Sequence, residues 1–118
     1  MSEFVFLFRS GDEEHRAAMG SPKQAEVTMK KWIAWIKELG EKGQLLNPGQ
    51  PLERVGKVVK GRQKLVTDGP YAESKDIVGG FMLVQARDLA HAAEISTGCP
   101  IFENGGLVEV RPVIKLDL

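Results

Sequence analysis

The chain has 118 residues, 42% of them hydrophobic, which is typical of one domain with a modest core, so residues 1–118 are expected to form a single domain. Sixteen basic residues balance sixteen acidic ones, which leaves no overall field to attract nucleic acid or an anionic membrane. The single cysteine excludes a disulfide within the chain, and the apolar run at 4–8 is too short for a signal-peptide core or a membrane span, so we expect a cytoplasmic protein.

The first part of the chain predicts a strand, a loop and a long helix. Residues 3–9 are aromatic and β-branched, as in a strand, and the polar, glycine-containing residues 10–21 are expected to form a loop. Ser21 is a good N-cap and Pro22 suits the first helical position, so a helix is predicted from there to about residue 40. Its core stripe is predicted to comprise Ala25, Met29, Trp32, Ile33, Ile36 and Leu39, with Trp35 at the edge.

The rest of the chain predicts short strands and one more helix. The expected elements are a turn-rich connection over 44–53, a hairpin of 54–60 and 63–67, a turn at 67–78, a strand over 80–86, a helix from Asp88 to about Thr97 and a strand over 107–113. The order β-α-β-β-α-β predicts a ferredoxin-like α+β fold, in which both helices cover one face of an antiparallel sheet.

Two predicted strands are apolar on both faces. A sheet covered on one side should alternate apolar and polar residues, but residues 4–8 and 81–84 do not. Because two helices cover only one face, the other face needs a cover as well. An isologous homodimer, sheet against sheet, is the simplest solution, and a monomer with a folded-back tail is the alternative.

The turn that begins at Thr67 is the most informative local feature. Asp68-Gly69 favours a tight turn, and Pro70 prevents further strand pairing, so the backbone is stiff and sharply bent. Such a turn would hold Asp68, Tyr71, Glu73 and Lys75 at fixed angles near one another. The alternative is a purely structural turn in which Asp68 caps its own loop amides.

Two charges stand on the last predicted strand. Glu109 and Arg111 are two residues apart and therefore share one face of the strand. They are either solvent-facing edge residues or the lining of a polar pocket, where a guanidinium beside a carboxylate suits an anionic or carbonyl-bearing small ligand.

The remaining chemistry-bearing residues favour structural roles. His15 lies in an acidic loop and His91 on the polar side of a helix, and neither has a second ligand at metal spacing. Cys99 has no nearby histidine or cation to activate it. No nucleotide, dinucleotide or metal motif occurs, so no cofactor and no metal are expected. Trp32 and Trp35 are either core residues or an aromatic wall for a ligand.

Four segments form a longer pattern: Val66–Lys75, Gly79–Phe81, Cys99–Pro100 and Val108–Val113. Together they closely resemble the DGPF, or YCII-related, domain family over nearly the whole chain. Residue 71 is Tyr where the family name records Phe, which keeps the ring and adds a hydroxyl. The resemblance implies a dimeric α/β-barrel built from ferredoxin-like subunits.

The resemblance also bears on the site. Matched by its spacing before Leu45-Leu46, Trp32 stands where the smaller YCII-type relatives carry a histidine proposed to act with an aspartate. That general base is therefore missing here, and Asp68 becomes the candidate catalytic residue. Some relatives are lyases that eliminate halide from aromatic substrates, and DGPF proteins are often linked with extracytoplasmic-function sigma factors.

Three functions follow as hypotheses. The first is a small-molecule-binding or regulatory domain, with a site near Asp68-Gly69-Pro70. Its expected ligand-binding residues are Trp32, Asp68, Gly69, Pro70, Tyr71, Glu73, Lys75, Glu109 and Arg111. The second is a lyase or isomerase in which Asp68 transfers a proton on a cyclic or phenolic substrate. The third is an accessory partner of a sigma factor.

Overall fold

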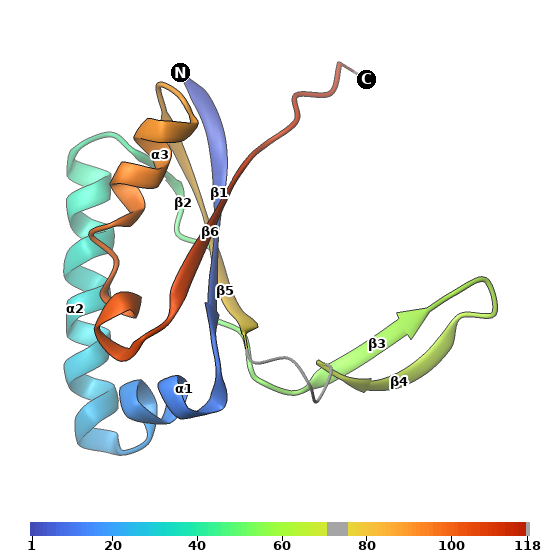
Figure 1. The fold of residues 1–118 in the computed structure, drawn as a ribbon. Coiled ribbons are helices and arrows are strands. Elements are labelled where there is room, and N and C mark those ends of the chain that lie inside the picture. Colours follow the sequence, from blue (N-terminus) through green and yellow to red (C-terminus); the bar gives the residue numbers. More distant parts are fainter. Residues whose placement is uncertain (71–75, 118) are drawn as a thin grey trace.

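The structure, a computed structural model, describes residues 1–70 and 76–117. In chain order its elements are β1 (Ser2–Ser10), α1 (Asp12–Met19), α2 (Pro22–Glu41), β2 (Leu45–Asn47), β3 (Gly56–Lys60), β4 (Leu65–Gly69), β5 (Ile77–Ala86), α3 (Leu89–Ser96), the 3-10 helix η1 (Pro100–Asn104) and β6 (Leu107–Pro112). Four strands form one antiparallel sheet in the order β2-β5-β1-β6. The helices cover one face of this sheet (Figure 1), which confirms the predicted α+β, ferredoxin-like class.

The central strand β1 separates two environments by alternation of its side chains. Phe4, Phe6 and Phe8 point toward the helices and are at most 6% exposed. Val5 and Leu7 point to the opposite face and are only half-buried. These three phenylalanines belong to the hydrophobic core. The other buried core residues are Trp35, Leu39, Met82, Val84, Ala86, Ala92 and Cys99.

Helix α2 buries a different stripe from the one predicted. Trp35 is 5% exposed and stacks on Phe6, with ring centroids 6.3 Å apart, whereas Ile33 is 59% exposed. The predicted stripe is therefore wrong at these two positions and at Met29, which is also exposed. The buried face is centred on Thr28, Trp35 and Leu39, because α2 must present its largest ring to the phenylalanines of β1.

Three local predictions are corrected. Residues 10–21 are not a loop, because Asp12–Met19 forms α1, whose first turn carries three acidic residues that suit the positive end of a helix. Within the connection predicted over 44–53, Leu45–Asn47 forms the edge strand β2 beside β5. The strand predicted over 80–86 begins three residues earlier, at Ile77.

The predicted hairpin forms, but as a separate two-stranded sheet of β3 and β4. It projects away from the main sheet on the side opposite the helices (Figure 1). We call residues 55–70 the arm. Because β3 and β4 stand outside the main sheet, the fourth strand of that sheet is the short β2.

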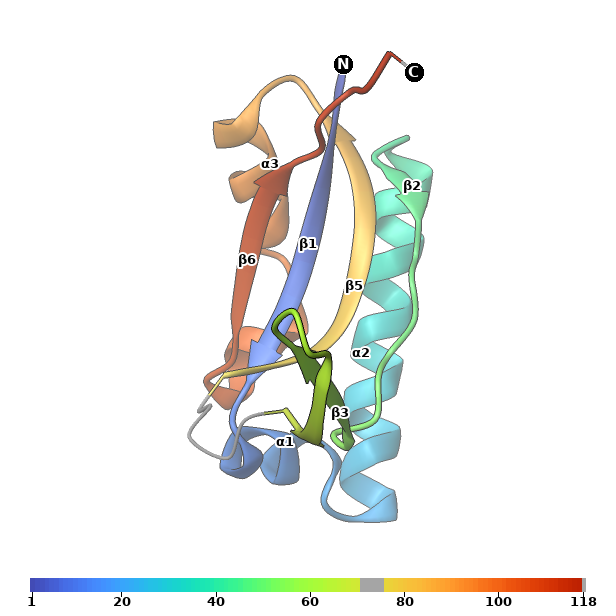
Figure 2. The ribbon, with the colours of Figure 1, turned by 90° about the vertical axis from the view of Figure 1, so that its right-hand side faces the viewer.

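The face of the main sheet turned away from the helices is called here the open face. It is lined at its centre by the half-buried side chains of Val5, Leu7, Phe81 and Leu83. Figure 2 looks onto this face, with the arm in front of its lower end. Within residues 1–70 and 76–117, no helix is long and apolar enough to cross a membrane.

Candidate functional site

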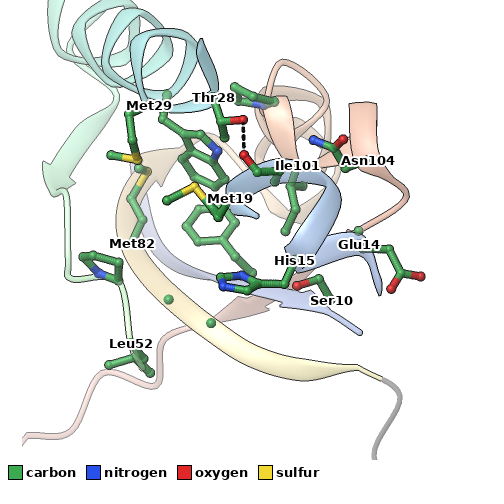
Figure 3. Close-up of a pocket in the computed structure, with 18 of the residues that line it drawn as sticks. Ser10, Glu14, His15, Met19, Thr28, Met29, Leu52, Met82, Ile101 and Asn104 are labelled. Carbon is green, nitrogen blue, oxygen red and sulfur yellow. Dashed lines mark hydrogen bonds between the residues drawn. The ribbon is translucent and has the colours of Figure 1, made fainter. Parts of the chain in front are cut away.

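A cavity of about 230 Å³ lies beneath α1, between α2 and the sheet (Figure 3). Its walls are mostly apolar and include Phe8, Met19, Met29, Trp32, Ile36, Leu52, Met82 and Ile101. Its polar lining includes Ser10, Glu14, His15, Thr28, Arg54 and Asn104. A cavity of ~150 Å³ is large enough to accept a benzene ring, so this one can hold a single substituted ring.

Aromatic rings form the floor of the cavity. Trp32 meets Phe8 edge to face, with ring centroids 4.9 Å apart and planes at 89°. Trp32 also meets Trp35 edge to face at 5.9 Å, and Trp35 in turn belongs to the core. The cavity floor is therefore built on rigid core packing rather than on loops, which is a favourable basis for a preformed site.

One wall is a segment that we call the strap, residues 48–54. Pro51 bridges to Gly80 of β5, and the Leu52 amide donates to the Gly79 carbonyl at 2.8 Å. Gly49 has a φ of +66°, and a Cβ at this position would collide with the Phe81 carbonyl oxygen. Only glycine therefore lets the strap approach β5 this closely.

The end of the strap is tied to α1. Arg54 donates through Nε to Oδ1 of Asp12 at 3.0 Å and through Nη2 to the carbonyl of Ser10 at 3.1 Å. The Arg54 side chain is only 17% exposed. The carboxylate of Asp12 compensates the charge of the guanidinium, so this end of the cavity has little net charge.

His15 projects from α1 into the cavity (Figure 3). Burial lowers the pKa of His15 from its ordinary value of 6.5; Arg54 acts in the same direction, and Asp12 opposes both. The imidazole is therefore neutral at pH 7, with one nitrogen that donates a hydrogen bond and one that accepts.

Helix α1 is held over the cavity by α2. The Thr28 hydroxyl donates to the Ala18 carbonyl at 2.6 Å, as the dashed line in Figure 3 shows. This bond satisfies a carbonyl near the C-terminal end of α1, which is short and buries no residue of its own. Thr28 thus positions α1, and with it His15.

Most of the residues predicted for the site lie elsewhere. Trp32 lines the cavity, but Asp68, with 92% of its side chain exposed, lies on the arm and pairs with Lys57 across the hairpin. Gly69 ends β4 and Pro70 follows it, so both belong to the arm and not to the cavity wall. Tyr71, Glu73 and Lys75 lie outside the described residues.

The predicted pair on β6 belongs to the open face. Glu109 lies opposite Leu7 and Arg111 opposite Val5. The Glu109 carboxylate pairs with Arg9 at 2.9 Å and lies 4.0 Å from Nε of Arg111. Because opposed residues of neighbouring strands share a sheet face, this charged pair points away from the helices and from the cavity.

The sequence alone does not identify His15 and Arg54 as site residues. It places His15 in a loop, although the acidic turn that starts at Asp12 is a signal for a helix start. On such a helix, His15, Ala18 and Met19 share one face, and all three line the cavity. Arg54 carries no local signal, because its partners are 42 and 44 residues distant in the chain.

The other reactive groups have structural surroundings. Burial raises the pKa of Cys99 to about 12, although a hydrogen bond with the Ile101 backbone acts in the opposite direction. Among the described residues, no three His, Cys, Asp or Glu side chains gather as metal ligands would.

The comparison with protein families agrees with this architecture. The family model of the YCII-related domain matches residues 4–117, which is almost the whole chain. No curated protein matches the chain.

Proposed function

Since the chain belongs to the YCII-related domain family, we propose that it is a small-molecule-binding domain whose ligand occupies the cavity beneath α1. The observation that carries this proposal is the combination of an apolar, aromatic-floored cavity with a single neutral imidazole directed into it. Binding sites for small molecules typically combine apolar walls with a few convergent polar groups.

The lining favours a neutral, ring-sized ligand with one hydrogen-bonding group. A carboxylate would compete with Asp12 for Arg54, and it would lose its hydration in an otherwise apolar cavity. A phenol or a cyclic ketone has no such cost, because His15 can accept from a hydroxyl or donate to a carbonyl. The walls of Phe8 and Trp32 supply contacts for the ring.

The site expected near Asp68-Gly69-Pro70 has less support as a place for a ligand. Asp68 is mostly exposed and already pairs with Lys57. A hydrogen bond to a ligand is stronger when the protein group that makes it is buried. For the same reason Asp68 is a weak candidate for a general base. The alternative of a lyase or isomerase acting on a phenolic substrate is better supported at His15, since a neutral imidazole beside an apolar cavity can accept a proton.

The proposal also includes a homodimer formed through the open face. Its support is the row Val5, Leu7, Phe81 and Leu83, which the helices of this chain leave uncovered. A cytoplasmic location is part of the proposal, and a sigma factor is a further partner suggested only by the family resemblance.

Ligand binding can be tested by thermal unfolding and fluorescence with phenol, cyclohexanone and benzoate as probes. In a Trp35→Phe variant, Trp32 is the only tryptophan and reports directly on the cavity. We expect phenol and cyclohexanone to raise the unfolding temperature and change this fluorescence, and benzoate to do neither; a ligand at 100 times its Kd stabilises by about 2.7 kcal/mol.

A matched pair of variants on α1 provides the control. Ala18→Phe should fill the cavity and abolish both responses, whereas Ala17→Phe, at an exposed position outside the cavity, should leave them intact. Equal responses in the two variants would show that the probes bind elsewhere and would overturn the proposed site.

A further inference from the structure

The arm is an isolated ribbon with an apolar surface. Val55 is 79% exposed, Val59 62%, Leu65 64% and Val66 58%. In the arm, Val59 pairs with Val66 across the two strands. A hairpin of two strands is at best marginally stable in water unless another surface packs against it. Because the arm extends away from the main sheet of its own chain (Figure 1), it needs a surface of another molecule to pack against.

The size of the exposed surface indicates how much a partner must cover. The chain exposes 8383 Å², whereas a folded monomer of 13.0 kDa is expected to expose about 6,300 Å². The excess of about 2,000 Å² is more than the ~800 Å² that each partner buries in a standard interface, and is typical of an obligate homodimer. The radius of gyration, 15.7 Å, also exceeds the roughly 13.5 Å expected for this length.

The arm and the open face lie on the same side of the main sheet (Figures 1 and 2). A second copy packed on the open face would therefore meet the arm as well. In an isologous dimer this relationship is reciprocal, since each protomer offers one arm and receives the other.

The charge of the arm also suits a second copy. Residues 55–70 carry four basic residues and one acidic residue, so the arm is positive by three and the rest of this neutral chain is negative by three. Each arm would thus approach a protomer body of opposite net charge, which favours association.

From these observations we propose that the arm is a dimerisation clasp that packs against the second copy, beyond the contact between the two open faces. This inference rests on the homodimer of the proposed function and adds the element that would hold it together. It also gives a role to Asp68, Gly69 and Pro70. These residues do not form the tight turn predicted for them, because Asp68 and Gly69 pair within β4. Asp68 pairs with Lys57 across the arm, and a Cβ on Gly69 would collide with Cγ2 of Val58, so these residues fix the base of the clasp.

The decisive experiment measures the dimer Kd by analytical ultracentrifugation for the wild type and two variants. V59K/V66E replaces the apolar cross-strand pair of the arm by a pair of opposite charges. Opposite charges at facing positions still favour the pairing of β3 with β4. Leu83→Glu disrupts the open face. We expect the arm variant to raise the dimer Kd by roughly 100-fold while the unfolding temperature of its monomer is unchanged, and the open-face variant to abolish the dimer.

The outcomes separate the two proposals. An unchanged Kd in V59K/V66E together with a monomeric Leu83→Glu variant would overturn the clasp and leave the open-face dimer standing. A wild type that stays monomeric at every concentration would overturn both, while leaving ligand binding in the cavity unaffected.

Hydrogen exchange of the wild type gives a second measurement that needs no variant. Amides of β3 and β4 should become more protected as the protein concentration rises through the dimer Kd. Arm protection that is independent of concentration would show that the arm packs on its own chain and would also overturn the clasp.

Discussion

The Nη2 atom of Arg54 lies 2.9 Å from Oδ1 of Asp12, and this ion pair joins the strap to the first turn of α1. The two segments that it joins form adjacent walls of the cavity. The ion pair therefore helps to hold the walls of the cavity together.

Arg54→Met should weaken the binding of phenol to the cavity and lower the free energy of unfolding by about 1–2 kcal/mol, because it removes the bonds to Asp12 and to the Ser10 carbonyl. Denaturant unfolding and probe titration measure the two effects. Arg87→Met, at an exposed position between β5 and α3 and outside the cavity, is the matched control. Equal losses in the two variants would contradict a specific role for Arg54.

The close approach of the strap to β5 can be tested at Gly49. Gly49→Ala should lower stability markedly, because a Cβ collides with the Phe81 carbonyl and the residue has a φ of +66°. Gly40→Ala is the control, since Gly40 lies in α2 and a Cβ there would meet no described atom beyond its own helix within 4 Å; it should stabilise the protein by roughly 0.5–1 kcal/mol. The two alanine variants should therefore differ in the sign of their effect in urea unfolding.

Two apolar positions on α2 should respond differently to truncation. Trp35→Ala should lower the free energy of unfolding by about 3–5 kcal/mol, because it removes the ring that stacks on Phe6. Ile33→Ala, on the same helix but 59% exposed, should change stability by no more than about 0.5 kcal/mol. Similar losses at the two positions in chemical denaturation would mean that α2 is rotated from the orientation described.

The pH dependence of stability should contain a contribution from His15. Because its pKa is lowered in the folded state, the unfolded chain binds a proton more readily as the pH falls below 6.5. His15 therefore does not affect the free energy of unfolding at pH values well above 6.5. As the pH drops below 6.5, this free energy falls, and it stops falling once the pH is below the pKa of His15 in the folded state. Burial is the main cause of the lowered pKa of His15; the charge of Arg54 lowers this pKa further, and the charge of Asp12 raises it. His15→Gln should reduce the difference in unfolding free energy between about pH 5 and pH 7.5; an unchanged difference would contradict this.

Cys99 should resist alkylation in the native protein. Burial raises the pKa of its thiol to about 12, so very little thiolate is present at pH 8. Iodoacetamide labelling followed by mass spectrometry should proceed only at the rate of unfolding and should accelerate in urea. Rapid labelling without denaturant would show that the thiol is accessible.

Local signals in the sequence are sufficient to predict much of the fold. The N-cap at Ser21 and the proline after it mark the start of α2, and Asp88 likewise caps α3. Strand β1 follows from its aromatic and β-branched run. These features depend on neighbours within a few residues, which a single sequence displays directly.

Features that depend on contacts between residues distant in the sequence are harder to predict. The separation of β3 and β4 from the main sheet depends on which strand edge pairs with β5, and the short β2 takes that place. The choice between Trp35 and Ile33 depends on the rings of β1 beneath α2. Both are tertiary effects, which override local preferences.

The candidate site is the least predictable part. The cavity is assembled from β1, α1, α2, the strap, β5 and η1, which are distributed over most of the chain. Of the predicted site residues that the structure describes, Trp32 alone lines the cavity. The motif at Asp68 is conspicuous because its residues are contiguous, whereas His15 and Arg54 meet only after folding.

The alternation along β1 has a consequence for how this domain can diverge. Its even-numbered positions, such as Phe6, face the core, and its odd-numbered positions, such as Leu7, face the open side of the sheet. A change at an odd position alters that outer surface without disturbing the packing of Trp35. Substitutions on the outer face can therefore change what this surface contacts while the fold is retained, because alternate residues of β1 line the two faces of the sheet.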